Sequence, residues 1–251
     1  MIEVIYKRVK DAELKLRVFF PKGWTKQDRR PAIIFFFGGG WKGGTWDHFK
    51  SHSEYLVSKG MIAITPDYRV SSRFDVTPFD CVMDAKAAVQ WVVENAGEIG
   101  VDTKKIAVGG GSAGGHLAAC TALIKDIRYD PMQVYKVPNA MVLYNPVINT
   151  SEKGFGYDRL GDRALEISPV HHVTEGVPAT IIFHGTADRT VPFTNVEEFK
   201  AEMTNKGNLC VLVPYEGRGH AFFNREKGNE DYSDTLSKTY EFLCSYGYVR
   251  S

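Results

Sequence analysis

The sequence contains few cysteines and no arrangement that would bind a metal. Four cysteines lie far apart without any C-x-x-C pair: Cys81, Cys120, Cys210 and Cys244. This spacing excludes an ordinary zinc site and a dense disulfide framework, so we expect buried free thiols. The adjacent histidines His171 and His172 have no third ligand at a suitable spacing, and we therefore expect neither a metal nor a cofactor.

Long hydrophobic runs and a charge excess are also missing. The longest apolar run, 32–37, falls far short of the ~20 residues that span a bilayer. The first ten residues alternate apolar and polar side chains, unlike a secretory signal, which predicts a cytoplasmic protein, or a secreted one if a leader has been removed. The net charge is +1 and basic residues come in pairs rather than a long run, so we expect neither nucleic acid nor a membrane as partner.

What the chain does contain is a repeated alternation of strand-like and helix-like segments. From about residue 31 this alternation is typical of an α/β fold with a mainly parallel sheet. The expected parallel strands are AIIFFF, MIAITP, KIAVGG, AMVLYNP, ATIIFHG and CVLVPYEG. Two earlier segments, IEVIYKRV and ELKLRVFF, are separated by turn residues around Asp11 and predict an antiparallel hairpin at the sheet edge.

The helical segments carry their own start and stop signals. Thr77 as N-cap and Pro78 at the first position predict a helix that Gly97 ends. Thr194 and Glu197 form a capping-box pattern ahead of another helix. Further helices are expected at 46–58, at 112–125 and around 236–243. No repeat, low-complexity tract or linker interrupts the chain, so we expect a single domain over 1–251 with a short irregular, cap-like excursion at 151–175.

The stretch VGGGSAGGH at 108–116 fits two glycine signatures with unrelated chemistry. Read as G-x-G-x-x-G it resembles a dinucleotide fingerprint, and read as G-x-S-x-G it resembles a nucleophile elbow. A dinucleotide site needs the motif at the first strand-to-helix crossing and an acid about 20 residues later. Here the motif follows several strands, and Asp130 at that distance does not end an apolar strand. The elbow is therefore favoured, with Gly109 incidental.

The elbow requires an acid and a base later in the chain, in the order Ser, Asp or Glu, His. His220, in EGRGHAFF, is the histidine that follows the late strand, and we expect it to be the base for Ser112. Asp188, in the loop after 179–183, is the expected acid; Glu216 and Asp162 are weaker candidates.

The tetrahedral intermediate of such a reaction needs hydrogen-bond donors for its oxyanion. A glycine loop at 38–40 follows the first parallel strand and lets backbone N–H groups point at the substrate, and the N–H of Ala113 completes the hole. Trp41 and Phe222 adjoin these loops and are candidate pocket residues.

The segments FGGGW, GGSAGG, HGTADRTVP and GRGHAFF together resemble α/β-hydrolase esterases, near the hormone-sensitive-lipase-like and acetyl-esterase or acetylxylan-esterase-like groups, over residues 31–224. The resemblance implies an eight-stranded, mainly parallel sheet with helices on both faces, the triad Ser112, Asp188 and His220, and the oxyanion donors Gly39, Gly40 and Ala113. Phe37 departs from the pattern, because these relatives usually have His before the glycines; the hydrogen bonds of that His are absent or replaced.

Together these observations predict a serine carboxylesterase that works through an acyl-serine intermediate. The missing amino-terminal cap helices and the short excursion favour short-chain or carbohydrate-linked acyl esters, including feruloyl esters. Two rivals stay open. A prolyl-oligopeptidase-like peptidase shares the triad order but usually carries a separate gating domain, and a non-catalytic binder on the same scaffold usually lacks a triad member.

Overall fold

One eight-stranded sheet organises the computed structural model, which describes residues 1–10, 12–127, 135–227 and 229–249. The predicted hairpin turn at Asp11 and the acid Asp130 lie outside these residues. Strand order is β1-β2-β4-β3-β5-β6-β7-β8. The strands are β1 (Ile2–Val9), β2 (Ala12–Phe19), β3 (Arg30–Phe36), β4 (Ile62–Pro66), β5 (Val101–Gly111), β6 (Ala140–Tyr144), β7 (Ala179–Gly185) and β8 (Cys210–Tyr215).

The pairing confirms the mainly parallel sheet and the edge hairpin. β1 pairs with β2 antiparallel, and β2 pairs with β4 antiparallel. From β4 through β3 and β5 to β8 every neighbouring pair is parallel. The carboxyl ends of these parallel strands therefore share one edge of the sheet, where loops carry side chains toward a common point.

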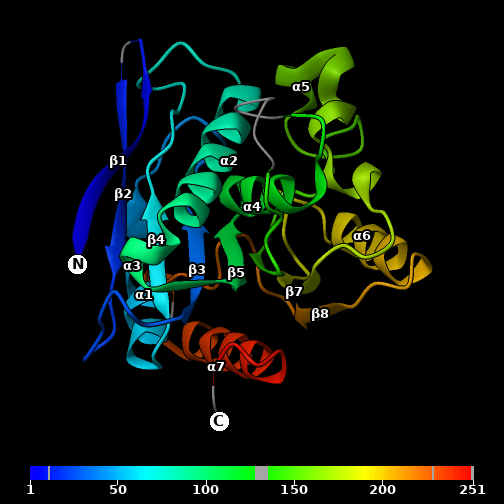
Figure 1. Cartoon of the computed structure of the whole chain (residues 1–251). Coiled ribbons are helices and arrows are strands. Elements are labelled where there is room, and N and C mark those ends of the chain that lie inside the picture. Colours follow the sequence, from blue (N-terminus) through cyan, green and yellow to red (C-terminus); the bar gives the residue numbers. More distant parts are fainter. Residues whose placement is uncertain (11, 128–134, 228, 250–251) are drawn as a thin grey trace.

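Helices cover both faces of the sheet (Figure 1). The helices are α1 (Lys50–Ser58), α2 (Pro78–Glu94), α3 (Ala96–Ile99), α4 (Ala113–Leu123), α5 (Tyr157–Leu160), α6 (Phe193–Asn205) and α7 (Asn229–Ser245). Side chains alternate along β3: Ile34 and Phe36 join the core cluster under α2, α4 and α6, whereas Ile33 and Phe35 join the cluster under α1 and α7.

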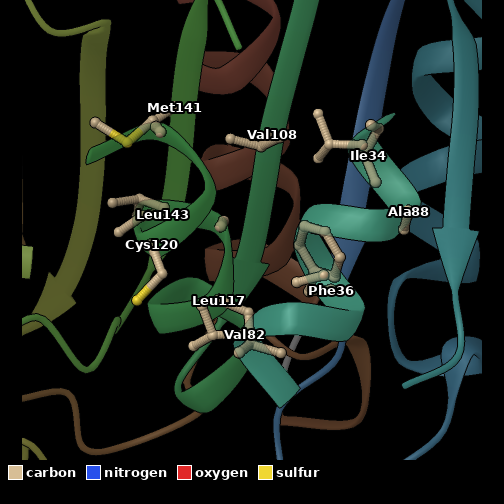
Figure 2. Close-up of a cluster of buried hydrophobic side chains, with 14 of the residues drawn as sticks. Ile34, Phe36, Val82, Ala88, Val108, Leu117, Cys120, Met141 and Leu143 are labelled. Atoms are coloured by element: carbon tan, nitrogen blue, oxygen red, sulfur yellow. The ribbon is translucent and has the colours of Figure 1, made fainter. Parts of the chain in front are cut away.

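The core between the sheet and the α2–α4 layer fixes the element that follows β5. Figure 2 shows Ile34, Phe36, Val108 and Met141 from three strands packed toward side chains of α2 and α4. Every residue of α4 is buried. Because the helix has no polar face, it is held tightly between layers, and its first turn is fixed relative to the ends of β3 and β5.

Helix ends differ in detail from the sequence predictions. The prediction that Gly97 ends the second helix is wrong: α2 ends at Glu94, Gly97 lies inside α3, and left-handed Gly100 (φ 68°) terminates that turn. The Thr194 cap is also wrong, because Pro192 is the N-cap of α6 and Thr194 lies inside the helix. The predicted N-cap Thr77 and Pro78 at the first position are confirmed, and the structure adds a capping box between Thr77 and Asp80.

The excursion is more regular than predicted. Within 151–175, α5 is followed by two 3-10 turns, Gly161–Ile167 and Pro169–His172. Among the cysteines, Cys81, Cys120 and Cys210 are buried free thiols, whereas Cys244 is only half-buried. Within the described residues no helix is long and apolar enough to cross a membrane, and no cluster of three potential metal ligands occurs. The cytoplasmic location stays a prediction.

Candidate active site

Ser112 lies in a strained turn between β5 and α4. Its φ is 55° and its ψ is −122°, a conformation that is costly for a residue with a side chain. The turn is possible because its neighbours are glycines: a Cβ on Gly114 would lie 2.1 Å from the carbonyl oxygen of Phe36, and one on Gly110 would lie 2.5 Å from Gly114. These glycines therefore give room to the strained serine.

The structure brings Ser112, His220 and Asp188 into one hydrogen-bonded line. Nε2 of His220 lies 2.9 Å from Oγ of Ser112, and Nδ1 of His220 lies 2.6 Å from Oδ2 of Asp188. Ser112 follows β5, Asp188 follows β7 and His220 follows β8, so three parallel strand ends deliver the three side chains. The carboxyl group can hold the proton on Nδ1 and leave Nε2 free to accept the proton of the hydroxyl group.

Asp188 is held ionised by its surroundings. Its side chain is fully buried, whereas that of His220 is 22% exposed. Burial alone would raise the pKa of Asp188, but hydrogen bonds from His184, His220 and the N–H of Val191 outweigh it and hold the pKa below the usual range. His184 donates from Nε2 to the carbonyl of Val191 at 2.9 Å and thereby orders the loop after β7.

The glycine loop lies against the serine, as predicted. Gly38, Gly39 and Gly40 follow β3 and line one cavity together with Ser112. Gly39 and Gly40 have φ of 128° and 61°, a backbone conformation that is unfavourable for residues with a side chain. Ala113 is the first residue of α4, so its N–H has no carbonyl earlier in the helix to bind.

The cavity around Ser112 measures about 320 Å³ and corrects the predicted pocket. Phe155 and Phe223 line it, whereas Trp41 and Phe222 do not. Trp41 is 2% exposed and packs against His116 and Phe155. Phe222 is also buried, against Tyr215 and Phe223. Both predicted residues therefore support the cavity from behind without forming its wall.

Two residues that the sequence analysis did not identify form hydrogen bonds to the loops around Ser112 and His220. Asn145, buried at φ 33°, accepts the N–H of Ala221, next to His220. Arg159 of α5 donates to the carbonyl of Gly40 at 2.5 Å, so the 151–175 excursion supports the glycine loop. No motif singled out these two side chains, because each acts on a backbone atom that is distant in sequence.

Phe37 stands where the sequence resemblance leads us to expect a histidine, and two other side chains hydrogen-bond the loop at this point. Tyr68 donates its hydroxyl to the carbonyl of Phe37 at 2.8 Å, with the two rings stacked 4.0 Å apart. His48 accepts the N–H of Gly38 at Nδ1, at 3.0 Å. With phenylalanine at position 37, Gly38 is still buried and both polar atoms of the peptide group before it are hydrogen-bonded, whereas Gly39 is exposed.

Gly109, predicted to be incidental, is required by packing. A Cβ there would lie 2.7 Å from the ring of Phe35 and 2.8 Å from the carbonyl of Val142. Real Cβ atoms do not approach backbone so closely, so an added methyl group would push neighbouring strands apart. Its role is structural, and the dinucleotide pattern that it completes is a coincidence.

Known proteins resemble this chain in family and in fold. The BD-FAE family model matches residues 16–150. Esterase 2 of Thermogutta terrifontis, in a structure phosphoramylated by tabun, is 45% identical with a TM-score of 0.95 over 100% of this chain and 96% of that chain. Its propionate-bound structure is 44% identical with a TM-score of 0.94 over the same shares.

Curated relatives match a smaller part of this chain. Carboxylesterase NlhH of Mycobacterium tuberculosis is 34% identical over 48% of this chain and 37% of its own length. Esterase LipC of the same organism is 26% identical over 79% of this chain and 56% of its own length. The chain therefore spans between about a third and just over half the length of these curated relatives.

Proposed function

This chain belongs to the BD-FAE family of α/β-hydrolase esterases, and from that premise we propose that it is a serine carboxylesterase that hydrolyses short-chain acyl esters. The observation that carries the proposal is the hydrogen-bonded line from Ser112 through His220 to Asp188, beginning at a strained turn that opens into a cavity. No cofactor is needed for this reaction.

The first half of the proposed reaction transfers the acyl group to the serine. Oγ of Ser112 attacks the ester carbonyl while Nε2 of His220 takes its proton, and Asp188 stabilises the resulting imidazolium ion. The N–H groups of Gly39, Gly40 and Ala113 donate hydrogen bonds to the carbonyl oxygen and stabilise the negative charge that develops on it. When the carbon–oxygen bond to the alcohol breaks, His220 returns the proton to the departing oxygen, and an acyl-serine remains.

The second half repeats these roles with water. His220 takes a proton from a water molecule, whose oxygen attacks the acyl carbon. The same N–H groups stabilise the second oxyanion. Collapse of this intermediate breaks the bond to Oγ, and His220 returns the proton to Ser112. The acid leaves, and the enzyme is unchanged.

The size and lining of the cavity support a small acyl group. Its volume of about 320 Å³ lies at the lower end of the ~300–1,000 Å³ found for ligand sites, and Phe155 and Phe223 offer apolar contacts. Thermogutta esterase 2 has been solved with propionate and with butyrate. Thr190 and Asn224 also line the cavity and suit a hydroxyl-rich alcohol, so our proposal includes carbohydrate-linked acetyl esters.

Turnover of 4-nitrophenyl esters of increasing acyl length tests the function. We expect the largest kcat/KM at acetyl to butyryl and a steep fall at octanoyl and longer chains, with Ser112→Ala inactive at every length. Ser58→Ala, at the exposed end of α1, is the matched control. Ordinary activity of Ser112→Ala would refute the mechanism, and a preference for long chains would refute the substrate class.

A second assay examines the alcohol and the acyl type. Release of acetate from acetylated xylan is expected to exceed release of ferulate from feruloyl esters, because a ferulic acyl group is long and rigid for the cavity. Cleavage of proline-containing peptides by the wild type but not by Ser112→Ala would favour the peptidase alternative instead.

A further inference from the structure

The peptide group between Phe37 and Gly38 is held by side chains at both of its polar atoms. Its carbonyl oxygen accepts the hydroxyl of Tyr68 at 2.8 Å, and its N–H donates to Nδ1 of His48 at 3.0 Å. This peptide group directly precedes Gly39 and Gly40, the proposed oxyanion donors. Because both ends are bound, the plane cannot rotate without losing a partly or fully buried hydrogen bond. The direction in which the following N–H groups point is fixed with it.

His48 can make this contact only in one protonation state. A backbone N–H always donates, so Nδ1 must carry no proton, and the ring proton must reside on Nε2. Nε2 lies 2.8 Å from Oδ1 of Asn224 and donates to it. Burial lowers the pKa of His48 and keeps the ring neutral. Asn224 therefore selects the tautomer that Gly38 requires.

The same ring joins the two halves of the site. Gly38 belongs to the loop after β3, and Asn224 lies four residues after His220, in the loop after β8. His48 also lines the cavity beside Ser112. One imidazole thus connects the loop of the proposed oxyanion donors with the loop of the proposed base.

We propose that His48 is a positioning residue that orients the oxyanion donors of Gly39 and Gly40 through the N–H of Gly38 and keeps them in register with the loop of His220. It does not exchange a proton with the substrate. The inference rests on the proposed esterase function and identifies how the glycine loop of that site is held in place with phenylalanine at position 37.

His52 provides an unusually close control. It lies one helical turn further on, and its ring is 4.8 Å from Phe49 and 5.9 Å from Phe223, against 4.7 Å and 5.8 Å for His48. Neither ring nitrogen of His52 has a hydrogen-bond partner among the described residues. The two histidines share these two ring contacts and differ in their hydrogen bonds, and His52 packs against Phe35, Tyr144 and Tyr232 as well.

The test compares His48→Phe, His48→Asn and His52→Phe by steady-state hydrolysis of 4-nitrophenyl acetate. Phenylalanine keeps the ring and removes both nitrogens, and we expect kcat to fall about 30- to 100-fold with KM within about threefold, because misplaced donors affect mainly the transition state. Asparagine places Oδ1 near the former Nδ1, so His48→Asn should recover kcat to within about fivefold of the wild type. His52→Phe should stay within about threefold.

A second variant approaches the same peptide from its other side. Tyr68→Phe keeps the ring stacked on Phe37 and removes only the hydroxyl, and we expect kcat to fall about tenfold with KM little changed. This result supports the inference even if His48→Phe does not fold. Wild-type kcat in His48→Phe, equal losses in the two histidine-to-phenylalanine variants, or no recovery in His48→Asn would overturn it, as would wild-type kcat in Tyr68→Phe if His48→Phe does not fold.

The outcomes separate this inference from the proposed function. If Ser112→Ala retains turnover, the esterase mechanism itself is wrong. If Ser112→Ala is inactive while His48→Phe keeps its full kcat, the mechanism stands and only the positioning role of His48 fails.

Discussion

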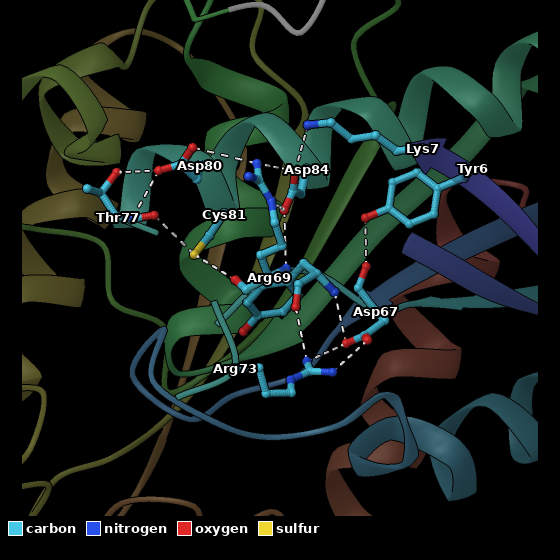
Figure 3. A network of polar contacts seen from close by, with 10 residues as sticks. Tyr6, Lys7, Asp67, Arg69, Arg73, Thr77, Asp80, Cys81 and Asp84 are labelled. Atoms are coloured by element: carbon cyan, nitrogen blue, oxygen red, sulfur yellow. Dashed lines mark hydrogen bonds and ion pairs between the residues drawn. The ribbon is translucent and has the colours of Figure 1, made fainter. Parts of the chain in front are cut away.

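Two buried aspartates lie in hydrogen-bonded networks of similar density and have different uses. Asp188, after β7, binds His220 and the N–H groups of Thr190 and Val191. Asp84, on α2, accepts a hydrogen bond from Lys7 at 2.6 Å and two from the guanidinium of Arg69 at 2.8 Å and 2.9 Å (Figure 3). Both carboxyl side chains are fully buried.

The difference lies in what each partner can do with a proton. Arg69 keeps its charge, because hydrogen bonds to Asp84 raise the pKa of the guanidinium. Its contacts hold α2 and the segment after β4 together, and the bond from Lys7 adds β1. The partner of Asp188 is an imidazole with a second nitrogen, 2.9 Å from a hydroxyl group beside a cavity. A buried carboxylate becomes part of a reactive site when its partner can gain and lose a proton.

The largest expected effect is on the reactive network. Asp188→Asn should lower kcat for 4-nitrophenyl acetate by about 10⁴-fold, because the amide no longer selects the tautomer of His220. The amide oxygen can still accept the N–H groups of Thr190 and Val191, so the melting temperature should change by only a few degrees. A kcat within tenfold of the wild type would place the acid elsewhere, with Glu216 and Asp162 the next variants to make.

The structural network should show the opposite result. Asp84→Asn leaves Lys7 and Arg69 without a full counter-charge in a buried site, and we expect a loss of about 3–5 kcal/mol in the free energy of unfolding. The kcat of the folded protein should stay within about threefold. Asp67→Asn, which disturbs a partly exposed pair with Arg73, is the matched control and should cost less than about 1 kcal/mol. Urea unfolding of the wild type, Asp84→Asn and Asp67→Asn measures these free energies.

A smaller effect concerns the pH dependence of stability, which a buried histidine controls. Burial lowers the pKa of His116 to about 4. The unfolded state therefore binds more protons than the folded state between pH ~6.5 and about 4, so stability falls as the pH drops through this window. His116→Gln can still donate to the carbonyl of Ile167 that His116 contacts, and should flatten the fall in melting temperature between pH 7 and pH 4.5. An unchanged pH dependence would contradict this assignment.

The sequence predicted the sheet and the three central side chains for clear reasons. Each predicted parallel strand contains a short apolar run, and the roles of nucleophile, acid and base require particular residue types at strand ends in a fixed order. Ser112, Asp188 and His220 therefore stand out without coordinates, and the structure places them in hydrogen-bond contact.

The residues that support the site could not be predicted, because most of them bind backbone N–H or C=O groups of residues that are distant in the sequence. His48 contacts a backbone N–H ten positions away and an amide 176 positions away, and nothing in its neighbourhood distinguishes it from His52. The pocket shows the same limit: Phe222 and Phe223 are adjacent, and only the backbone of their turn decides that Phe223 faces the cavity. The predictions of two helix ends were wrong, because Asn95 caps α2 in place of Gly97 and Pro192 caps α6 in place of Thr194.

The most direct test of the reactive role of the Asp188 network is covalent labelling by paraoxon, followed by peptide mass spectrometry. Esterase 2 of Thermogutta terrifontis has been solved phosphorylated by this reagent. We predict one phosphoryl adduct per chain, on the peptide that contains Ser112, formed at a near wild-type rate in Asp84→Asn and strongly slowed in Asp188→Asn. An adduct on another residue, no adduct, or equal labelling rates in the two variants would contradict the account.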